Sequence, residues 1–139
     1  MDRLLLALGI AVVAAIVALM MRRRGSDAPT QATGRIPEQL DRADFADPET
    51  PWLVAVFTSA TCDACKDVRS KAEVLATSEV SVAVSEYPGD KAIHDRYRID
   101  AVPLVVIADD RGVVRKSFIG PVTATDLWAG VAAARDERT

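Results

Sequence analysis

The sequence predicts an α/β domain, with a mixed β-sheet flanked by helices, that follows one N-terminal transmembrane helix. Two observations indicate the domain: strand-like and helix-like segments alternate along residues 36–135, and two of the strand-like segments are unbroken apolar runs. Strands that alternate with helices and then close with a hairpin are typical of a mixed sheet covered by helices. A third observation, an uncharged apolar stretch of 18 residues near the N-terminus, indicates the membrane helix.

The apolar stretch covers residues 4–21 and is followed by three arginines at 22–24. As an α-helix, a stretch of this length spans about 27 Å, close to the hydrocarbon thickness of a bilayer. A cleaved signal peptide is the alternative, with a basic start, a shorter apolar run and a cleavage site between small residues. The start here carries both Arg3 and Asp2, and no such cleavage site follows the run. We therefore expect residues 1–24 to form an uncleaved anchor.

The charges beside the apolar stretch predict on which side of the membrane the domain lies. Three arginines flank its C-terminal end, whereas at the other end Asp2 offsets Arg3. The positive-inside rule then places the arginines and the following domain in the cytoplasm, and an extracytoplasmic domain is the alternative. Residues 25–34, GSDAPTQATG, are small and polar and predict a flexible tether with a reach of roughly 15–20 Å. The soluble domain would then comprise residues 35–139.

Charge argues against nucleic acid as a partner of this domain. Residues 1–24 carry a net charge of +3, but the remaining 115 residues carry 13 basic and 19 acidic side chains. A nucleic-acid-binding domain needs a basic face. We therefore expect no nucleic-acid partner, and we expect the single domain to be a monomer.

Hydrophobic periodicity predicts the elements of the domain. Residues 52–58 and 104–108 are continuous apolar runs, which is typical of strands buried on both faces. The other expected elements are a short edge strand at 36–40, a helical turn at 41–45, a helix at 62–76, a strand at 80–86, a short polar helix at 91–98, a turn at 109–112, a return strand at 113–119, and a last helix that is capped by Thr123 or Thr125 and runs to about residue 135.

Three side chains are assigned from their surroundings in the sequence. Trp52 opens the first buried strand and is expected at the edge of the core, whereas Trp128 is expected to pack in the core with the apolar stripe of the last helix. His94 lies in the polar segment HDRYR and is expected at the surface.

The chain has two cysteines, Cys62 and Cys65, at the point where a buried strand gives way to a helix. The first turn of a helix has unpaired N–H groups and the positive end of the helix dipole, and both stabilise a thiolate. A spacing of three residues brings the two sulfurs onto one face of the helix. Cys62 can then attack a disulfide, and Cys65 can release the reduced product. The pattern predicts a redox pair.

Two other roles are open to a cysteine pair with this spacing. A C-x-x-C pair can supply half of a zinc site, but a structural zinc site needs four ligands, and His94 is the one histidine of the sequence. A pair of inert buried cysteines would not explain their position at the start of a helix. We therefore expect no metal at this site.

The segment around the cysteines resembles the thioredoxin family. The resemblance comprises a strand, a turn and CxxCK at the start of a helix, then YRIDAVP at residues 97–103 before a strand, and Gly120 after the hairpin. It spans about residues 36–135 and implies a thioredoxin-like fold. It further implies that the bond before Pro103 is cis, as X-Pro bonds tolerate, and that Pro103 lies against the cysteines.

The resemblance also implies the function and the site residues. Cys62 would be the exposed, attacking cysteine and Cys65 the shielded, resolving one, with no cofactor. The expected substrate groove consists of Thr61, Asp63, Ala64, Val102, Pro103 and Gly120. The chain looks like the membrane-anchored thioredoxin-like proteins of bacteria, which implies a thiol–disulfide oxidoreductase acting on protein thiols and disulfides near the membrane. A non-catalytic thioredoxin-fold adaptor that binds a membrane partner is the alternative.

The sequence departs from the thioredoxin pattern at several positions. Thioredoxins have a buried acid six residues before the first cysteine, where this chain has Val56, and the basic neighbour of that acid falls near Val84. The tryptophan before the first cysteine is Thr61, and the dipeptide between the cysteines is Asp-Ala. We therefore expect the thioredoxin proton relay to be absent. The charge of Asp63 opposes formation of the Cys62 thiolate, whereas the helix dipole and Lys66 favour it.

Overall fold

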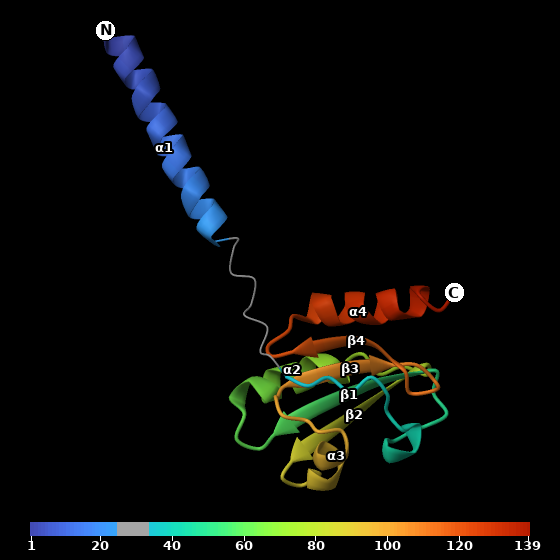
Figure 1. Cartoon of the computed structure of the whole chain (residues 1–139). Helices are drawn as coiled ribbons and strands as arrows, with labels where there is room; N and C mark the ends of the chain where they lie inside the picture. The colour runs from blue at the N-terminus through green and yellow to red at the C-terminus, as the bar shows by residue number, and fades with distance from the viewer. Residues whose placement is uncertain (25–33) are drawn as a thin grey trace. The chain divides into compact units, whose positions relative to one another are not determined.

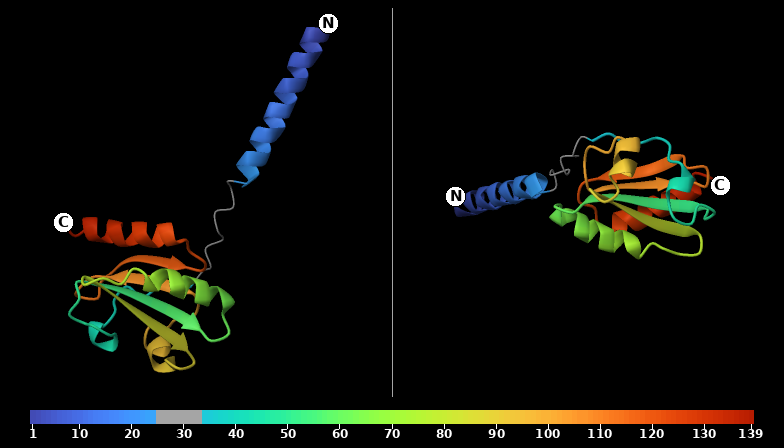
Figure 2. Two further views of the ribbon diagram at one scale, coloured as in Figure 1. Left: turned by 180° about the vertical axis from the view of Figure 1, so that it is seen from behind. Right: turned by 90° about the horizontal axis from the view of Figure 1, so that it is seen from below.

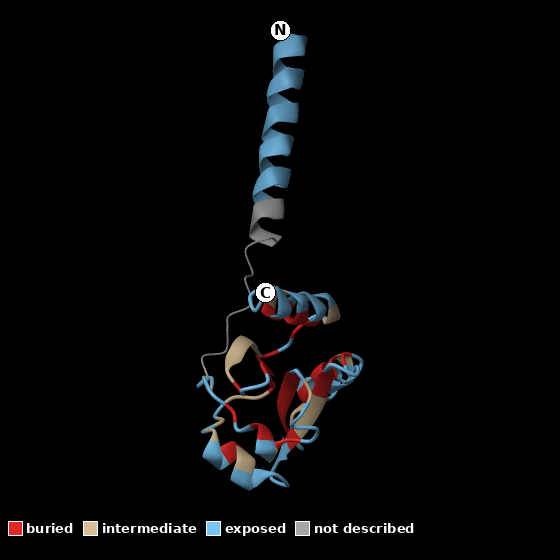
Figure 3. Ribbon diagram, turned by 90° about the vertical axis from the view of Figure 1, so that its right-hand side faces the viewer, coloured by how far each residue is buried: buried red, intermediate tan, exposed pale blue. Residues whose placement is uncertain are grey.

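The computed structural model describes residues 1–24 and 34–139. In the first part, α1 (Asp2–Arg24) is one continuous helix. Its window Asp2–Leu19 is long and apolar enough to cross a membrane, and every residue of that window is exposed (Figure 3). A signal sequence near the N-terminus has the same properties. The predicted tether, residues 25–34, lies outside the described residues except for Gly34.

The second part, residues 34–139, is built on a four-stranded mixed sheet with the strand order β2-β1-β3-β4 (Figure 1). The strands are β1 (Trp52–Ser59), β2 (Val80–Tyr87), β3 (Leu104–Ala108) and β4 (Val114–Ile119). The helices of this part are the 3-10 helix η1 (Arg42–Asp44), α2 (Asp63–Glu73), α3 (Lys91–Arg96) and α4 (Ala124–Asp136). The central strand β1 runs parallel to β2 and antiparallel to β3, and β3 pairs antiparallel with β4. The predicted mixed sheet flanked by helices is confirmed.

The central strand supplies side chains to both faces of the sheet, which explains its unbroken apolar run. Trp52, Val54 and Val56 pack with buried residues of α2 and α4 on one face. The alternate residues of the strand pack on the other face with Leu40 and Phe45, which flank η1, and with residues around α3. Figure 2 (right) shows α2 and α4 on one side of the sheet and η1 and α3 on the other.

The expected edge strand at residues 36–40 is wrong. Within that segment only Gln39 forms a β-bridge, and its partner is Val113. The segment contains Pro37, which has no N–H to give to a ladder. The helix expected at residues 62–76 is shorter than predicted. It begins at Asp63 after its N-cap residue Cys62 and ends at Glu73, and Ala76 beyond its end is exposed.

The turn predicted at residues 109–112 is held by a buried carboxylate. Asp109 accepts hydrogen bonds from the backbone N–H groups of Arg111 and Val113, and its second oxygen accepts from Nε and Nη2 of Arg115. Burial by itself would raise the pKa of Asp109, but these donors outweigh it and hold that pKa below its ordinary value. Gly112 closes the turn at φ +78°, and a Cβ there would lie 1.9 Å from the Leu40 carbonyl oxygen.

The expected core position of Trp128 is wrong, because its side chain is 51% exposed on α4. The buried residues of α4 are Leu127, Gly130, Val131 and Ala134. A Cβ on Gly130 would lie 2.8 Å from the Phe118 ring, so this position has no room for a side chain and the helix approaches the sheet closely. Trp128 lies beside the resulting stripe of buried residues, outside the contact with the sheet. The other tryptophan, Trp52, is buried at the start of β1.

Candidate functional site: the Cys62–Cys65 pair

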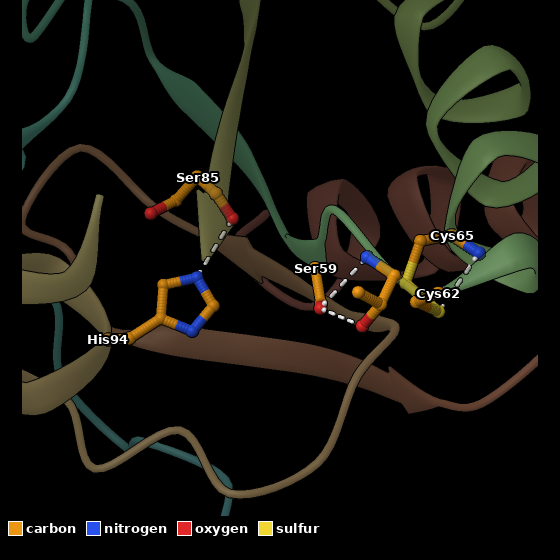
Figure 4. The surroundings of a disulfide bond; sticks show 6 residues. Ser59, Cys62, Cys65, Ser85 and His94 are labelled. Carbon is orange, nitrogen blue, oxygen red and sulfur yellow. Dashed lines mark hydrogen bonds between the residues drawn. A yellow bond between two sulfur atoms is a disulfide. The ribbon is translucent and has the colours of Figure 1, made fainter. Parts of the chain in front are cut away.

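The cysteine pair lies where β1 ends and α2 begins (Figure 4). The strand ends at Ser59, and the Ser59 carbonyl accepts a hydrogen bond of 3.1 Å from the Cys62 N–H. Cys62 is the N-cap residue of α2, and its Sγ accepts a hydrogen bond of 3.2 Å from the Cys65 N–H. The sulfur of Cys62 thus occupies the position where a helix N-terminus stabilises negative charge.

Cys62 and Cys65 form a disulfide, with their Cα atoms 5.3 Å apart. Cys65 is 2% exposed and belongs to the buried side of α2, whereas Cys62 is partly exposed. A thiol that approaches from solvent therefore reaches the Cys62 sulfur more readily. The side chains of Asp63 and Lys66 beside the pair are exposed, so water screens their opposing effects on a Cys62 thiolate.

The other expected groove residues lie around this end of the sheet. Leu104, the first residue of β3, pairs with Phe57, so the Val102–Pro103 segment lies opposite the last residues of β1. The Val102–Pro103 bond is cis, which confirms the prediction. Pro103 is buried, and its carbonyl accepts a hydrogen bond of 2.8 Å from the Gly120 N–H. A second cis bond, Tyr87–Pro88, was not predicted.

The remaining residues of the expected groove lie close to Cys62 in the sequence. Thr61 and Ala64 are exposed, as is Asp63. The Thr61 hydroxyl lies 3.2 Å from the Ser59 hydroxyl, so the turn before Cys62 is held by a side-chain hydrogen bond (Figure 4).

The core below α2 contains a valine where thioredoxins have an acid. Val56 is fully buried, it pairs with Val84 on β2 and Val105 on β3, and it packs in one cluster with Val68 of α2. Val68 follows Cys65 by three residues and shares the buried side of α2 with it. Val56 and the valines that it contacts have no ionisable group, so this position supplies no proton donor or acceptor.

His94 is buried, which corrects its expected position at the surface. Its side chain is 5% exposed, and its ring meets Phe57 edge-on with ring centres 5.6 Å apart. Nε2 lies 2.9 Å from the Ser85 carbonyl oxygen, which can only accept, so Nε2 carries a proton (Figure 4). The polar neighbours of His94 in the sequence point to solvent, but α3 turns this one position toward the sheet. Tyr97, three residues later, also packs on this face of the sheet, and this helical spacing was the one sequence feature that could have indicated the burial of His94.

A cavity of about 250 Å³ adjoins the cysteine end of the sheet. It is lined by Ser59, Tyr87, His94 and residues 99–102. It shares Ser59 with the turn that holds Cys62. The sequence carries no local signal for this cavity, because its walls come from three separate segments of the chain.

No family model matches this sequence, and no curated protein does. Among solved structures, the fold is similar to a thioredoxin variant from Halobacterium salinarum, with 20% identity, a TM-score of 0.55, and coverage of 63% of this chain and 77% of that chain. It is also similar to Fasciola hepatica thioredoxin, with 24% identity, a TM-score of 0.53, and coverage of 60% of this chain and 81% of that chain. Mitochondrial thioredoxin 3 from Saccharomyces cerevisiae is 22% identical, with a TM-score of 0.52 and coverage of 62% and 81%.

The chain has a thioredoxin fold. At these identities the likeness establishes the fold alone, so the chemistry must follow from this chain's own residues. In this thioredoxin fold, a disulfide lies at the start of a helix, with one sulfur accessible and the other buried. That arrangement supports thiol–disulfide redox chemistry in general, because the pair can take up two electrons and two protons and return to the disulfide.

Proposed function

We propose that the protein is a membrane-anchored thiol–disulfide oxidoreductase that exchanges electrons with protein dithiols and disulfides. The observation that carries the proposal is the Cys62–Cys65 disulfide at the N-terminus of α2, with Cys62 partly exposed and Cys65 buried. In the reducing direction, the Cys62 thiolate attacks a substrate disulfide, forms a mixed disulfide and releases one substrate thiolate. Cys65 then loses its proton and attacks the Cys62 sulfur, which releases the second substrate thiolate and forms the disulfide.

The residues around the pair support two parts of this reaction. The Cys65 N–H, which donates to Cys62 Sγ at 3.2 Å, stabilises the attacking thiolate. No acid occupies the position of Val56 below α2, so the proton of Cys65 passes to water or to exposed Lys66. The pair works in the oxidising direction by the same steps in reverse.

We further propose that residues 1–24 are the membrane anchor, that 25–34 are a tether and that 35–139 are a monomeric catalytic domain in the cytoplasm. Gly34 contacts the segment that precedes Pro103, because a Cβ on Gly34 would lie 2.7 Å from that of Ala101. The next N–H, that of Arg35, donates to Asp100 Oδ1 at 2.7 Å. The chain therefore enters the domain beside the cysteine end of the sheet.

This point of entry supports a class of substrate. Nine residues lie between Arg24 and Gly34, so ten Cα–Cα steps join them and span at most about 36 Å. The redox pair would thus remain near the membrane surface. Membrane proteins, and proteins held at that surface, are the proposed partners.

A non-catalytic adaptor is the second candidate. The apolar surroundings of Val56 favour it, because thioredoxin chemistry without a buried acid lacks an internal proton carrier. The adaptor would bind a membrane partner through the same groove without exchanging disulfides.

Trapping of the mixed disulfide tests the proposed function. Cys65→Ser in the full chain, expressed in cells, removes the resolving thiol, so complexes with partners should accumulate, survive denaturation and disappear on reduction. Cys62→Ser is the matched control and should trap none. Equal trapping by both variants would contradict the assigned roles, and no trapping by either in a folded, membrane-inserted protein would support the adaptor.

A further inference from the structure

One nitrogen of the buried His94 ring has no partner among the described residues. Nε2 donates to the Ser85 carbonyl oxygen, which leaves the lone pair of Nδ1 as an acceptor in the neutral ring. Figure 4 shows this second nitrogen turned away from Ser85. His94 is more than nine-tenths buried and lines the 250 Å³ cavity beside the cysteines. An unpaired acceptor on a residue that lines a cavity can recognise a donor that enters it.

The other walls of the cavity are mainly apolar. Ile99, Ala101 and Val102 contribute aliphatic groups, and Tyr87 contributes an aromatic ring. Asp100 also lines the cavity; its Oδ1 accepts a hydrogen bond from the Arg35 N–H, and its charge repels an acidic side chain. The cavity thus disfavours an acidic side chain and favours a group with an apolar body and a hydrogen-bond donor.

The size of the cavity limits what can occupy it. Pockets for small-molecule ligands and cofactors have volumes of about 300–1,000 Å³. The volume of about 250 Å³ found here is smaller and suits one amino-acid side chain. Ser59 lines the cavity, and its carbonyl accepts a hydrogen bond from the Cys62 N–H. A residue next to a substrate cysteine therefore lies within reach of the cavity when that cysteine reacts with Cys62.

We propose that this cavity is a specificity pocket for a tyrosine of the substrate, next to the reacting cysteine, and that His94 Nδ1 accepts the hydrogen bond of its hydroxyl. Tyrosine combines an apolar ring with a donor at its tip, which matches the walls and the acceptor. The proposal rests on the proposed function for its link to the reacting cysteine, and it adds the sequence context that the enzyme prefers.

The test uses the full chain in detergent micelles and three short peptides that each contain a disulfide. The peptides differ in one residue after the reacting cysteine, which is tyrosine, phenylalanine or glutamate. The protein is first reduced with dithiothreitol and separated from it, so that Cys62 and Cys65 are thiols, and the second-order rate constants for reduction of the three peptides are compared. Analogues with serine in place of each cysteine report binding alone, through shifts in the backbone NMR signals of Tyr87, Ile99 and Val102.

The parent should prefer tyrosine over phenylalanine by about 3- to 10-fold, which is the effect of one neutral hydrogen bond. The glutamate peptide should be the poorest. His94→Leu should abolish the preference for tyrosine, and His94→Gln should retain part of it because an amide oxygen can accept. Ile99→Phe should narrow the cavity and weaken both aromatic peptides, which keeps the test decisive if His94→Leu does not fold. Trp128→Phe, on the exposed side of α4, is the control and should keep the preference.

Two results would overturn the pocket: equal rates and equal binding for tyrosine and phenylalanine in the parent, or an unchanged preference in His94→Leu. Failure of the proposed function has a different signature. In that case the serine analogues bind with the tyrosine preference, but no disulfide peptide is reduced. If all peptides are reduced equally and the signals of Tyr87, Ile99 and Val102 do not shift, the function stands and the pocket does not.

Discussion

Replacing Val56 by Asp would restore a carboxyl at the position where thioredoxins have a buried acid. Val56 is fully buried between Val84 and Val105 in the sheet, and it packs against Val68 of α2. Val56→Asn is the matched control, because its side chain has nearly the same size and polarity but does not ionise. The comparison of the two variants separates the effect of a buried charge from that of a buried polar group.

The expected magnitude follows from the burial. Loss of a buried valine lowers the free energy of unfolding by about 1.5–3 kcal/mol, and an unpaired buried polar group lowers it by about 1–3 kcal/mol more. Both variants share these losses. Desolvation raises the pKa of the introduced carboxyl above about 3.9, its value in the unfolded chain. At a pH between these two pKa values, the carboxyl is ionised in the unfolded state but still protonated in the folded state. The free energy of unfolding of Val56→Asp therefore falls, relative to that of Val56→Asn, by about 1.4 kcal/mol for each pH unit.

Urea unfolding of both variants between pH 4 and pH 8, followed by tryptophan fluorescence, measures this difference. The two variants should unfold at similar urea concentrations near pH 4 and diverge as the pH rises, with Val56→Asp the less stable. Parallel pH dependences would show that the carboxyl reaches water and would refute the burial of Val56. The rate of disulfide reduction should also acquire a different pH profile in Val56→Asp. An unchanged profile would mean that proton transfer to and from Cys65 does not depend on this position.

Three other predictions concern the turn after β3 and the orientation of the chain. The pKa of Asp109 is lowered in the fold, so its stabilising effect is complete above about pH 4 and is lost as the pH falls below that value. Asp109→Asn should therefore lower the free energy of unfolding at pH 7 by about 1.5–3 kcal/mol and flatten its acid dependence, as urea unfolding at pH 3 and pH 7 would show. Gly112→Ala should destabilise the domain by more than about 1 kcal/mol, because its Cβ would overlap the Leu40 carbonyl at positive φ. Urea unfolding measures this loss, and Gly89→Ala is the control, since its Cβ would lie 3.5 Å from the nearest atom. Equal losses of stability in the two variants would refute the steric reasoning. A reporter that is active only outside the cytoplasm, fused to the C-terminus, should be inactive, and strong activity would reverse the proposed orientation.

Local sequence patterns predicted most of the elements because those elements depend on short-range chemistry. The two unbroken apolar runs form the central strands β1 and β3, as expected for strands covered on both faces. Thr123 caps α4, with its hydroxyl accepting from the Asp126 N–H. The expected edge strand was wrong because a strand needs a partner that its own residues do not specify, and Gln39 finds one only at Val113.

Side-chain environments were less predictable, because the residues that create them are distant in the sequence. Trp128 was expected in the core, but Gly130 brings α4 so close to Phe118 that small residues make the contact and the tryptophan stays outside. His94 was expected in solvent, but α3 turns it onto Phe57, which lies 37 residues earlier in the chain. In each case the sequence neighbours were a poor guide to the spatial neighbours.

The sequence by itself determined the local setting of the cysteine pair. Spacing and position placed Cys62 and Cys65 at the start of a helix, because that feature depends on neighbouring residues, and the resemblance of residues 97–103 to thioredoxins implied the cis bond at Pro103. The burial of Cys65 and the partial exposure of Cys62 agree with what the resemblance to thioredoxins implied, whereas the tertiary structure alone decided that His94 is buried and lines a cavity beside them. Burial depends on which segments pack together, and these segments meet only when the sheet forms and brings the ends of β1 and β2 and the residues before β3 to the same end of the sheet.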